Sequence, residues 1–323
     1  MILTLLLALA AGCSNNKETD VARQGAEEAQ LQKNRSEEDD NKDVILDKFR
    51  STVKQAKEAA EILSYLNENM SKAGQRNADT MIRELNAFYT ADLDKSQDAF
   101  VKPNVQEVLL EQSWPITSSN AASIEDKDVR QLVVTKLSGG YKLEQAEGTI
   151  FPIVDYAMQI KFTSFLSEEM NNYVQLKAVE SDEPAAKDGG LVITWKQLSE
   201  RAVMAEAFVA AYPGVPEAEE ALGLYLDSYL PMYIYGLNNT PVFDYDTYKL
   251  KDEVKDSYKK IIQEQPDTVT AVIVERFLKV LEHSNGMVYE NREGMQTSIP
   301  AVTQFHERFQ AEAKSLLLAK SGT

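Results

Sequence analysis

Few residues of this chain have the type and spacing that catalysis or metal binding requires. The sequence contains one cysteine, Cys13, and two histidines, His283 and His306. Two histidines exclude a histidine-rich metal site, and the sequence has no Gly-x-Ser-x-Gly elbow, no Gly-Lys-Ser/Thr phosphate loop and no His-Glu-x-x-His motif. His283 suits a helix end, and His306, beside Glu307 and Arg308, suits a polar helix face. We therefore predict no catalytic residue.

Two acidic runs have the opening alternation of a calcium-binding loop but lack its other requirements. In the run from Asp92, Gln97 stands where the sharp turn needs glycine, and Pro103 stands where the bidentate glutamate belongs. In the run from Asp244, Lys249 takes the glycine position. Helix caps and turns explain both runs better, so we expect no metal site and no cofactor.

The richest group of side chains is aromatic. Tyr225, Tyr229 and Tyr233 lie four residues apart and would share one helix face. A long connection with further aromatic residues follows them, and long ordered loops often serve function. Two interpretations stay open: most of these tyrosines form a hairpin core with hydroxyls at its rim, or they line a groove that stacks on sugar rings or a peptide. The candidate binding residues are Tyr229, Tyr233, Tyr235, Asn238, Asn239 and Phe243.

The one cysteine follows a short apolar run. Residues 2–11 are apolar apart from Thr4, which is long enough for the core of a signal peptide but about half the ~20 residues of a spanning helix. The small residues Ala10-Ala11-Gly12 directly precede Cys13, which has no disulfide partner within the chain. This stretch resembles the lipobox of bacterial lipoprotein precursors, in which small residues and glycine precede the lipidated cysteine.

The resemblance implies a signal peptide over 1–12 and a diacylglyceryl group with further acyl chains, such as palmitate, on Cys13. It also implies a position on the extracytoplasmic face of the cell membrane. Two or more acyl chains, at ~0.8 kcal/mol per buried methylene, hold a protein firmly at a bilayer. No later run approaches roughly eighteen apolar residues, so lipid on Cys13 is the expected membrane anchor.

The composition is that of a globular protein with an acidic surface. The chain has 323 residues, of which 43% are hydrophobic and 26% charged, so it can bury a sizeable core. Its net charge of −17 argues against nucleic acid, whose phosphates attract basic patches, and against attachment to anionic lipid headgroups. We therefore expect no nucleic-acid partner.

Residues 13–43 are polar and charged, most densely at 36–41. Because nothing in this stretch buries apolar surface, we predict a lipidated cysteine followed by a disordered acidic tether. About thirty residues of flexible coil span roughly 30 Å on average. Such a tether would lift a domain off the bilayer.

From Val44 onward, apolar residues recur every three or four positions, which predicts an all-α or mainly α fold. We expect a helical N-terminal region over 44–181, a bundle that opens with one long helix from Val44 to Met70. Residues 141–153 carry β-branched and aromatic side chains around Glu147-Gly148. They indicate one small β-hairpin, although their alternation is poor.

A loop rich in turn formers at 181–190 separates a C-terminal region of helical hairpins over 191–320. Thr194-Trp195-Lys196-Gln197 has the capping-box form and should begin a helix. Residues 208–221 contain an aromatic residue, Tyr-Pro, a second proline and spaced alanines. This pattern resembles the turn of tetratricopeptide-like helical hairpins, and residues 258–268 show a weaker form of it.

These features favour a binding protein. We expect a lipid-anchored scaffold or adaptor at the bacterial cell envelope that uses its helical hairpins to contact a protein partner. The alternative is a ligand-binding lipoprotein that grips wall glycan or a small solute through the tyrosine-rich loop. An enzyme that cleaves glycan with carboxylates is a third hypothesis, but the acidic residues are too numerous to nominate a pair, and we expect no enzyme.

Overall fold

The computed structural model describes residue 39 and residues 41–321. The signal-peptide stretch, Cys13 and most of the expected tether lie outside these residues. Within them the protein is mainly helical, and its only sheets are small antiparallel pairs of strands. The mainly α fold class is therefore confirmed, and so is the hairpin expected near 141–153.

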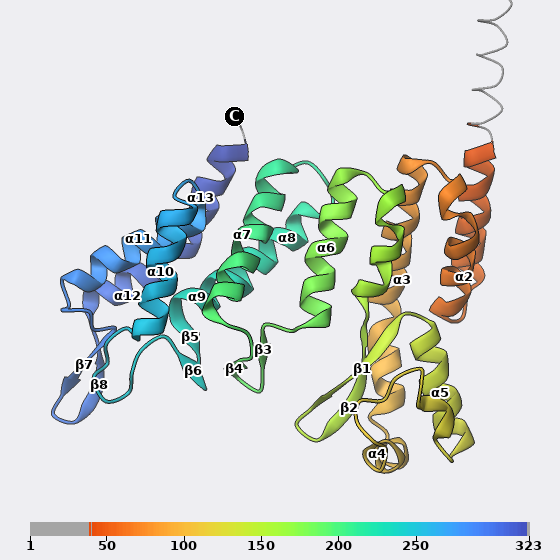
Figure 1. The fold of residues 1–323 in the computed structure, drawn as a ribbon, viewed down its shortest axis with the longest axis horizontal. Coiled ribbons are helices and arrows are strands. Elements are labelled where there is room, and N and C mark those ends of the chain that lie inside the picture. The colour runs from red at the N-terminus through yellow and green to blue at the C-terminus, as the bar shows by residue number, and fades with distance from the viewer. Residues whose placement is uncertain (1–38, 40, 322–323) are drawn as a thin grey trace, which may run out of the picture.

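The helices stand side by side in an elongated row that the chain follows from one end toward the other (Figure 1). The first half of the row holds a helix over 41–55, α2 (Ala59–Asn69), η1 (Met70–Lys72), α3 (Gln75–Phe100), α4 (Pro103–Leu110), η2 (Ala121–Ser123), α5 (Lys127–Ser138), η3 (Tyr156–Phe165) and α6 (Glu168–Asp182). The second half holds α7 (Trp195–Ala211), α8 (Ala218–Gly223), η4 (Leu224–Tyr229), α9 (Leu230–Tyr235), α10 (Asp252–Glu264), α11 (Val269–Glu282), α12 (Pro300–His306) and α13 (Phe309–Ser321).

Two-stranded hairpins project from one edge of this row, the lower edge in Figure 1. The expected hairpin is the longest of them, with Tyr141 opposite Val154. No sequence pattern predicted the other three. The four hairpins of the described residues are β1 (Tyr141–Ala146) with β2 (Thr149–Val154), β3 (Ala186–Lys187) with β4 (Gly190–Leu191), β5 (Gly236–Leu237) with β6 (Thr240–Pro241), and β7 (Tyr289–Arg292) with β8 (Met295–Ser298).

The long helix expected from Val44 to Met70 is interrupted at 56–58. The Glu61 carboxylate accepts hydrogen bonds from the backbone N–H groups of Lys57 (3.0 Å) and Glu58 (3.2 Å), so it caps a new helix start. Periodicity could not reveal this break, because the apolar spacing continues across it. The predicted start of α7 is confirmed: Thr194 is its N-cap, and Gln197 completes the capping box.

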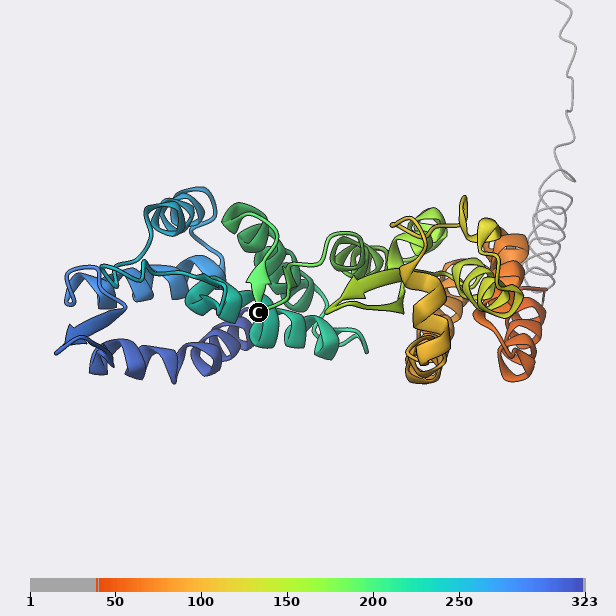
Figure 2. The same cartoon turned by 90° about the horizontal axis from the view of Figure 1, so that it is seen from below.

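One apolar core runs from Leu46 to Leu317, with members on both sides of the loop near 181–190. A smaller second core lies beneath β1 and β2, where α4 and α5 pack around Phe100 and Leu109. The last helix, α13, turns back and packs against α7 and α11, so the C-terminal end lies beside the middle of the molecule (Figure 2). This return holds the second half of the row together.

A buried polar junction fastens α3, α5 and β1. The Asp92 carboxylate accepts hydrogen bonds from Ser96 (2.7 Å), Lys136 (2.9 Å) and the Tyr141 hydroxyl (2.8 Å), and Lys136 also donates to Glu58 (2.7 Å). Asp92 and Lys136 are both buried, and breaking such a pair costs several kcal/mol because it strands a charge. The acidic run from Asp92 is therefore part of a helix with a structural ion pair.

Candidate functional site

Three tyrosines of the aromatic stretch form a buried series along η4 and α9, which we call the tyrosine ladder (Tyr225, Tyr229 and Tyr233). Their side chains are 0%, 1% and 0% exposed. Each hydroxyl meets a different helix. That of Tyr225 lies 3.2 Å from the Thr270 hydroxyl on α11, and that of Tyr229 donates to Glu180 on α6 at 2.9 Å.

The third hydroxyl, that of Tyr233, lies 2.7 Å from the hydroxyl of Ser257 on α10. Burial raises the pKa of Tyr233 to about 12, because an ionised phenolate would lose its hydration. The ladder thus joins α6, α10 and α11 to one helix. Tyr229 and Tyr233 lie in the core, as the first interpretation of the tyrosines held, and no surface ligand can reach them in this fold.

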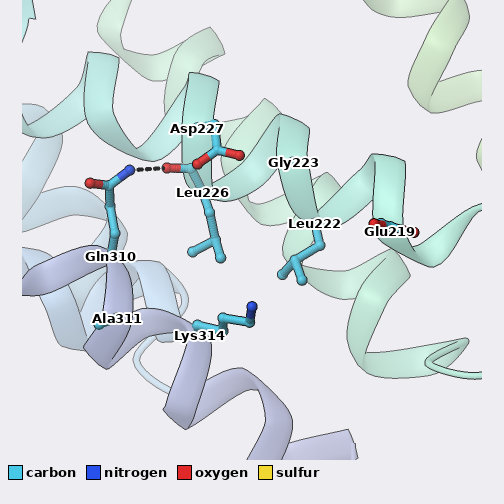
Figure 3. Close-up of a pocket in the computed structure, with 8 residues that line it drawn as sticks. All are labelled: Glu219, Leu222, Gly223, Leu226, Asp227, Gln310, Ala311 and Lys314. Atoms are coloured by element: carbon cyan, nitrogen blue, oxygen red, sulfur yellow. Dashed lines mark hydrogen bonds between the residues drawn. The ribbon is translucent and has the colours of Figure 1, made fainter.

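The ladder begins in a π-helical turn, η4, that leaves one backbone carbonyl without a backbone donor. Leu230 donates its N–H to the carbonyl of Tyr225, five residues back. In the same register the Leu226 carbonyl would need an N–H from Pro231, which has none. The side chain of Gln310 on α13 supplies the missing donor, with Nε2 2.8 Å from that carbonyl (Figure 3).

Gln310 also forms one wall of a shallow groove of about 360 Å³ between η4 and α13 (Figure 3). Leu222 and Leu226 form its apolar floor, and Glu219, Asp227 and Lys314 stand around it. These charged side chains are exposed to solvent, which screens their interaction with any ligand in the groove. The groove therefore gives a ligand little electrostatic stabilisation. The clearest role of its wall is the hydrogen bond from Gln310 to the Leu226 carbonyl.

Gly236 ends α9 and turns the chain away from the core. Its φ is +73°, and a Cβ atom there would lie 2.4 Å from the Thr240 carbonyl oxygen and 2.7 Å from the Val242 nitrogen. Only glycine fits this turn. Tyr235, two residues beyond the last ladder position, lies on another face of α9 and is 37% exposed.

The tip of the next hairpin, β5–β6, carries the two candidate asparagines, which have different roles. Asn239 docks this hairpin onto β3–β4: its side-chain amide donates to the Asp188 carbonyl at 2.7 Å, and its backbone N–H donates to the Gly189 carbonyl at 2.9 Å. The side chain of Asn238 has no hydrogen-bond partner among the described residues, and its backbone carbonyl accepts from Tyr245 at 3.2 Å. Asn238 is therefore the one of the pair whose amide is open to a ligand.

The loop after β6 is held by an acidic turn, as the sequence indicated for Asp244. The Asp244 carboxylate accepts hydrogen bonds from the backbone of Asp246 (3.1 Å) and from the backbone and hydroxyl of Thr247 (both 2.9 Å). These bonds, led by the one from the Thr247 backbone, lower the pKa of Asp244. Tyr248, at φ +55°, closes the turn in the left-handed region, which is strained for a bulky residue.

This loop, the β7–β8 hairpin and α12 enclose what we call the Tyr235 cleft, lined by Tyr235, Asn238, Phe243, Tyr245, Tyr289, Gln296 and His306. Two adjoining cavities of about 330 and 380 Å³ share Tyr235, Tyr289 and His306 as walls. The Phe243 ring meets Tyr245 and Tyr289 edge-on, with centroids 5.2 and 4.9 Å apart. Of the predicted residues, the cleft therefore unites Tyr235, Asn238 and Phe243.

His306 differs from its expected place on a polar helix face. Its ring lies 4.3 Å from the Tyr235 ring and 5.5 Å from the Phe277 ring, measured between centroids. Its Nε2 atom is buried without a hydrogen-bond partner, and burial lowers the pKa of His306 to about 4. The ring is therefore neutral at pH 7, and its buried nitrogen cannot take a proton from a ligand in the cleft.

Sequence reasoning missed Tyr289, Gln296 and His306 because they lie far along the chain from the tyrosine-rich loop. Tyr235 donates its hydroxyl to the backbone carbonyl of His306, 71 residues away, at 2.8 Å. No local pattern announces such a contact. The other histidine is where it was expected, since His283 is the C-cap of α11 and its ring Nδ1 lies 2.9 Å from the Lys279 carbonyl.

Among the described residues, no group of His, Cys, Asp and Glu side chains could hold a metal ion. No helix within 41–321 has the length and apolar character to cross a bilayer. No protein-family model, curated protein or solved structure matches the chain.

Proposed function

We propose that this protein is a lipid-anchored, extracytoplasmic scaffold or adaptor that binds a protein partner at the bacterial cell envelope. Lipid on Cys13 would hold it at the membrane, and residues 14–38 would link that anchor to the helical row. The proposal rests on the lipobox-like stretch before Cys13 and on the way the row presents its two edges.

The observation that carries the binding role is the placement of the hairpins. All four hairpins of the described residues project from one long edge of the row, whereas the helix over 41–55 begins at the opposite edge (Figure 1). A chain arriving from a lipidated Cys13 therefore joins the edge away from the hairpins. The hairpin edge would then lie away from the attachment point, where a partner can reach it.

The anchor is tested by Cys13→Ala, because Cys13 is the one cysteine of the chain. We expect the variant to leave the membrane fraction or to remain an uncleaved precursor. Detergent partitioning and the mass of the N-terminal peptide are the measurements. The same mass and partitioning for both proteins would refute the lipid anchor.

The binding edge is tested with a photo-crosslinking amino acid at one position on each edge. Met295, in β8, is 66% exposed. Gly214, in the α7–α8 connection at the opposite edge, is exposed and has open space beside it. In intact cells we expect a defined crosslinked protein from position 295 and none from position 214.

Equal crosslinking from both positions, or none from position 295, would contradict the hairpin edge as the contact surface. Both substitutions are at exposed sites, so both variants should fold and reach the same cellular fraction. A comparison of their thermal unfolding checks this before crosslinking is interpreted.

A further inference from the structure

The Tyr235 cleft is almost uncharged in a strongly acidic protein. The chain carries a net charge of −17, yet Glu307 is the one ionised side chain lining the two cavities formed by the described residues. His306 is neutral at pH 7 because burial lowers its pKa to about 4. The absence of lysine and arginine from these walls disfavours phosphates and carboxylates as ligands.

The exposed walls of the cleft are aromatic faces that are already held in place. Tyr245 is 60% exposed and Tyr235 is 37% exposed. Their hydroxyls donate to the backbone carbonyls of Asn238 (3.2 Å) and His306 (2.8 Å), so neither ring needs to be ordered on binding. Walls fixed before the ligand arrives spare it an entropic cost. A ligand in the cleft thus meets ring faces rather than free phenol groups.

Neutral hydrogen-bonding groups surround these rings. The amides of Asn238 and Gln296 each offer two N–H donors and a carbonyl acceptor, and Thr303 adds a hydroxyl. Val288 and Ile299 add apolar atoms to the walls. The two cavity volumes, about 330 and 380 Å³, fall at the small end of the ~300–1,000 Å³ range of ligand pockets.

We propose that the Tyr235 cleft binds a neutral carbohydrate that carries N-acetyl groups. The apolar C–H face of a sugar ring packs on an exposed tyrosine face, whose π-electrons attract those hydrogens. The N-acetyl amide matches the side-chain amides of Asn238 and Gln296 as both donor and acceptor, and its methyl group suits the apolar atoms of the walls. This binding role does not depend on the lipid anchor or on the protein partner.

The probes are hexamers of N-acetylglucosamine, which are neutral, and the same hexamers without acetyl groups, which are cationic. The full chain is purified in a detergent without a sugar headgroup, and binding is measured by isothermal titration calorimetry. We expect the neutral hexamer to bind and the cationic hexamer to bind at least tenfold more weakly. Tighter binding of the cationic hexamer would overturn the proposal, because attraction to the acidic surface would then explain it.

Variants locate the site. Tyr245→Ala removes the most exposed ring and should weaken binding of the neutral hexamer about tenfold, whereas Tyr245→Phe keeps the ring face and should stay within about threefold. Trp114→Ala is the matched control, because Trp114 is another exposed aromatic residue, 43% exposed, in a different part of the chain. It should change nothing.

Several results would refute the site. One is no binding of the neutral hexamer at millimolar concentration, and another is equal losses from Tyr245→Ala and Trp114→Ala. Binding of an uncharged peptide of similar size in place of the sugar would also refute the carbohydrate. None of these results bears on the membrane anchor, which Cys13→Ala tests separately.

Discussion

Two groups of tyrosines lie within about twenty residues of each other along the chain but differ in their exposure to solvent. The ladder residues Tyr225, Tyr229 and Tyr233 are at most 1% exposed, whereas Tyr235 and Tyr245 are 37% and 60% exposed. The residue type is the same, so the difference comes from the backbone. Four-residue spacing along η4 and α9 keeps the ladder turned inward, whereas Tyr235, two residues further along α9, lies on another face of that helix. Tyr245 lies in the loop after β6.

The two groups also use their hydroxyls differently. The three ladder hydroxyls meet side chains on other helices: Thr270 for Tyr225, Glu180 for Tyr229 and Ser257 for Tyr233. The cleft hydroxyls meet backbone carbonyls and leave their ring faces open. Buried tyrosines therefore connect the helices of the array, and the exposed tyrosines present ring faces to solvent that their hydroxyl hydrogen bonds hold in place.

Truncation of single tyrosines tests this difference most directly. Tyr233→Ala or Tyr229→Ala should lower the free energy of unfolding by about 3–5 kcal/mol, since each removes a fully buried ring and leaves a cavity. Tyr245→Ala should cost less than about 1 kcal/mol, because its ring is largely exposed. Urea denaturation measures all three. A cost for Tyr245→Ala as large as that for Tyr233→Ala would remove the distinction between the two groups.

The His306 ring, which packs against Tyr235, should make the free energy of unfolding depend on pH. Its pKa falls from 6.5 to about 4 through burial, so the unfolded chain binds a proton at pH values where the folded protein does not. The contribution of the neutral His306 ring to the free energy of unfolding is fully present above pH 6.5 and is lost as the pH falls toward 4. The loss should be roughly 1–3 kcal/mol, allowing for water near the ring.

Unfolding free energies of the unmodified protein and of His306→Phe, measured from about pH 7.5 to about pH 3.5, test this effect. Phenylalanine keeps the ring contacts but does not titrate, so the variant should lose less stability on acidification. Glu307 is present in both proteins, and its titration cancels in the difference. Parallel pH profiles would show that His306 titrates alike in the folded and unfolded chains.

The π-helical turn at the start of the ladder predicts that the stability cost of replacing Gln310 depends on the residue at position 231. Gln310→Ala should cost about 1–2 kcal/mol, because the Leu226 carbonyl loses its side-chain donor. In a Pro231→Ala background the backbone N–H of residue 231 becomes available, so the same change should cost clearly less. Lys314→Ala, on the same wall of the groove, is the control and should stay within about 0.5 kcal/mol. Equal costs for Gln310→Ala in both backgrounds would contradict this account of the turn.

The smallest expected effect separates the two asparagines of the β5–β6 hairpin. Asn239→Ala removes the hydrogen bond to the Asp188 carbonyl and should lower stability by about 0.5–1 kcal/mol. Asn238→Ala should leave stability nearly unchanged and weaken binding of the neutral hexamer. Thermal unfolding and the calorimetric titration distinguish the two variants. A reversed order of stability would mean that the docking of β5–β6 on β3–β4 does not stabilise the fold.

The features that could be predicted from the amino-acid sequence are those that depend on neighbours along the chain. Apolar spacing predicted the helical class, and the capping box at Thr194 predicted the start of α7. The four-residue spacing of Tyr225, Tyr229 and Tyr233 predicted their shared face. Each of these signals spans at most a few helical turns, within which side-chain spacing and backbone hydrogen bonds are fixed locally.

The membership of the cleft, in contrast, depends on how distant segments pack. Asn238 and Asn239 look alike in the sequence, but Asn239 alone meets a backbone carbonyl 51 residues away, that of Asp188. His306 looked like a surface residue until the packing of α12 placed its ring beside Tyr235. Such contacts are not encoded in the local pattern of apolar and polar residues, so they exist only once the helices have packed.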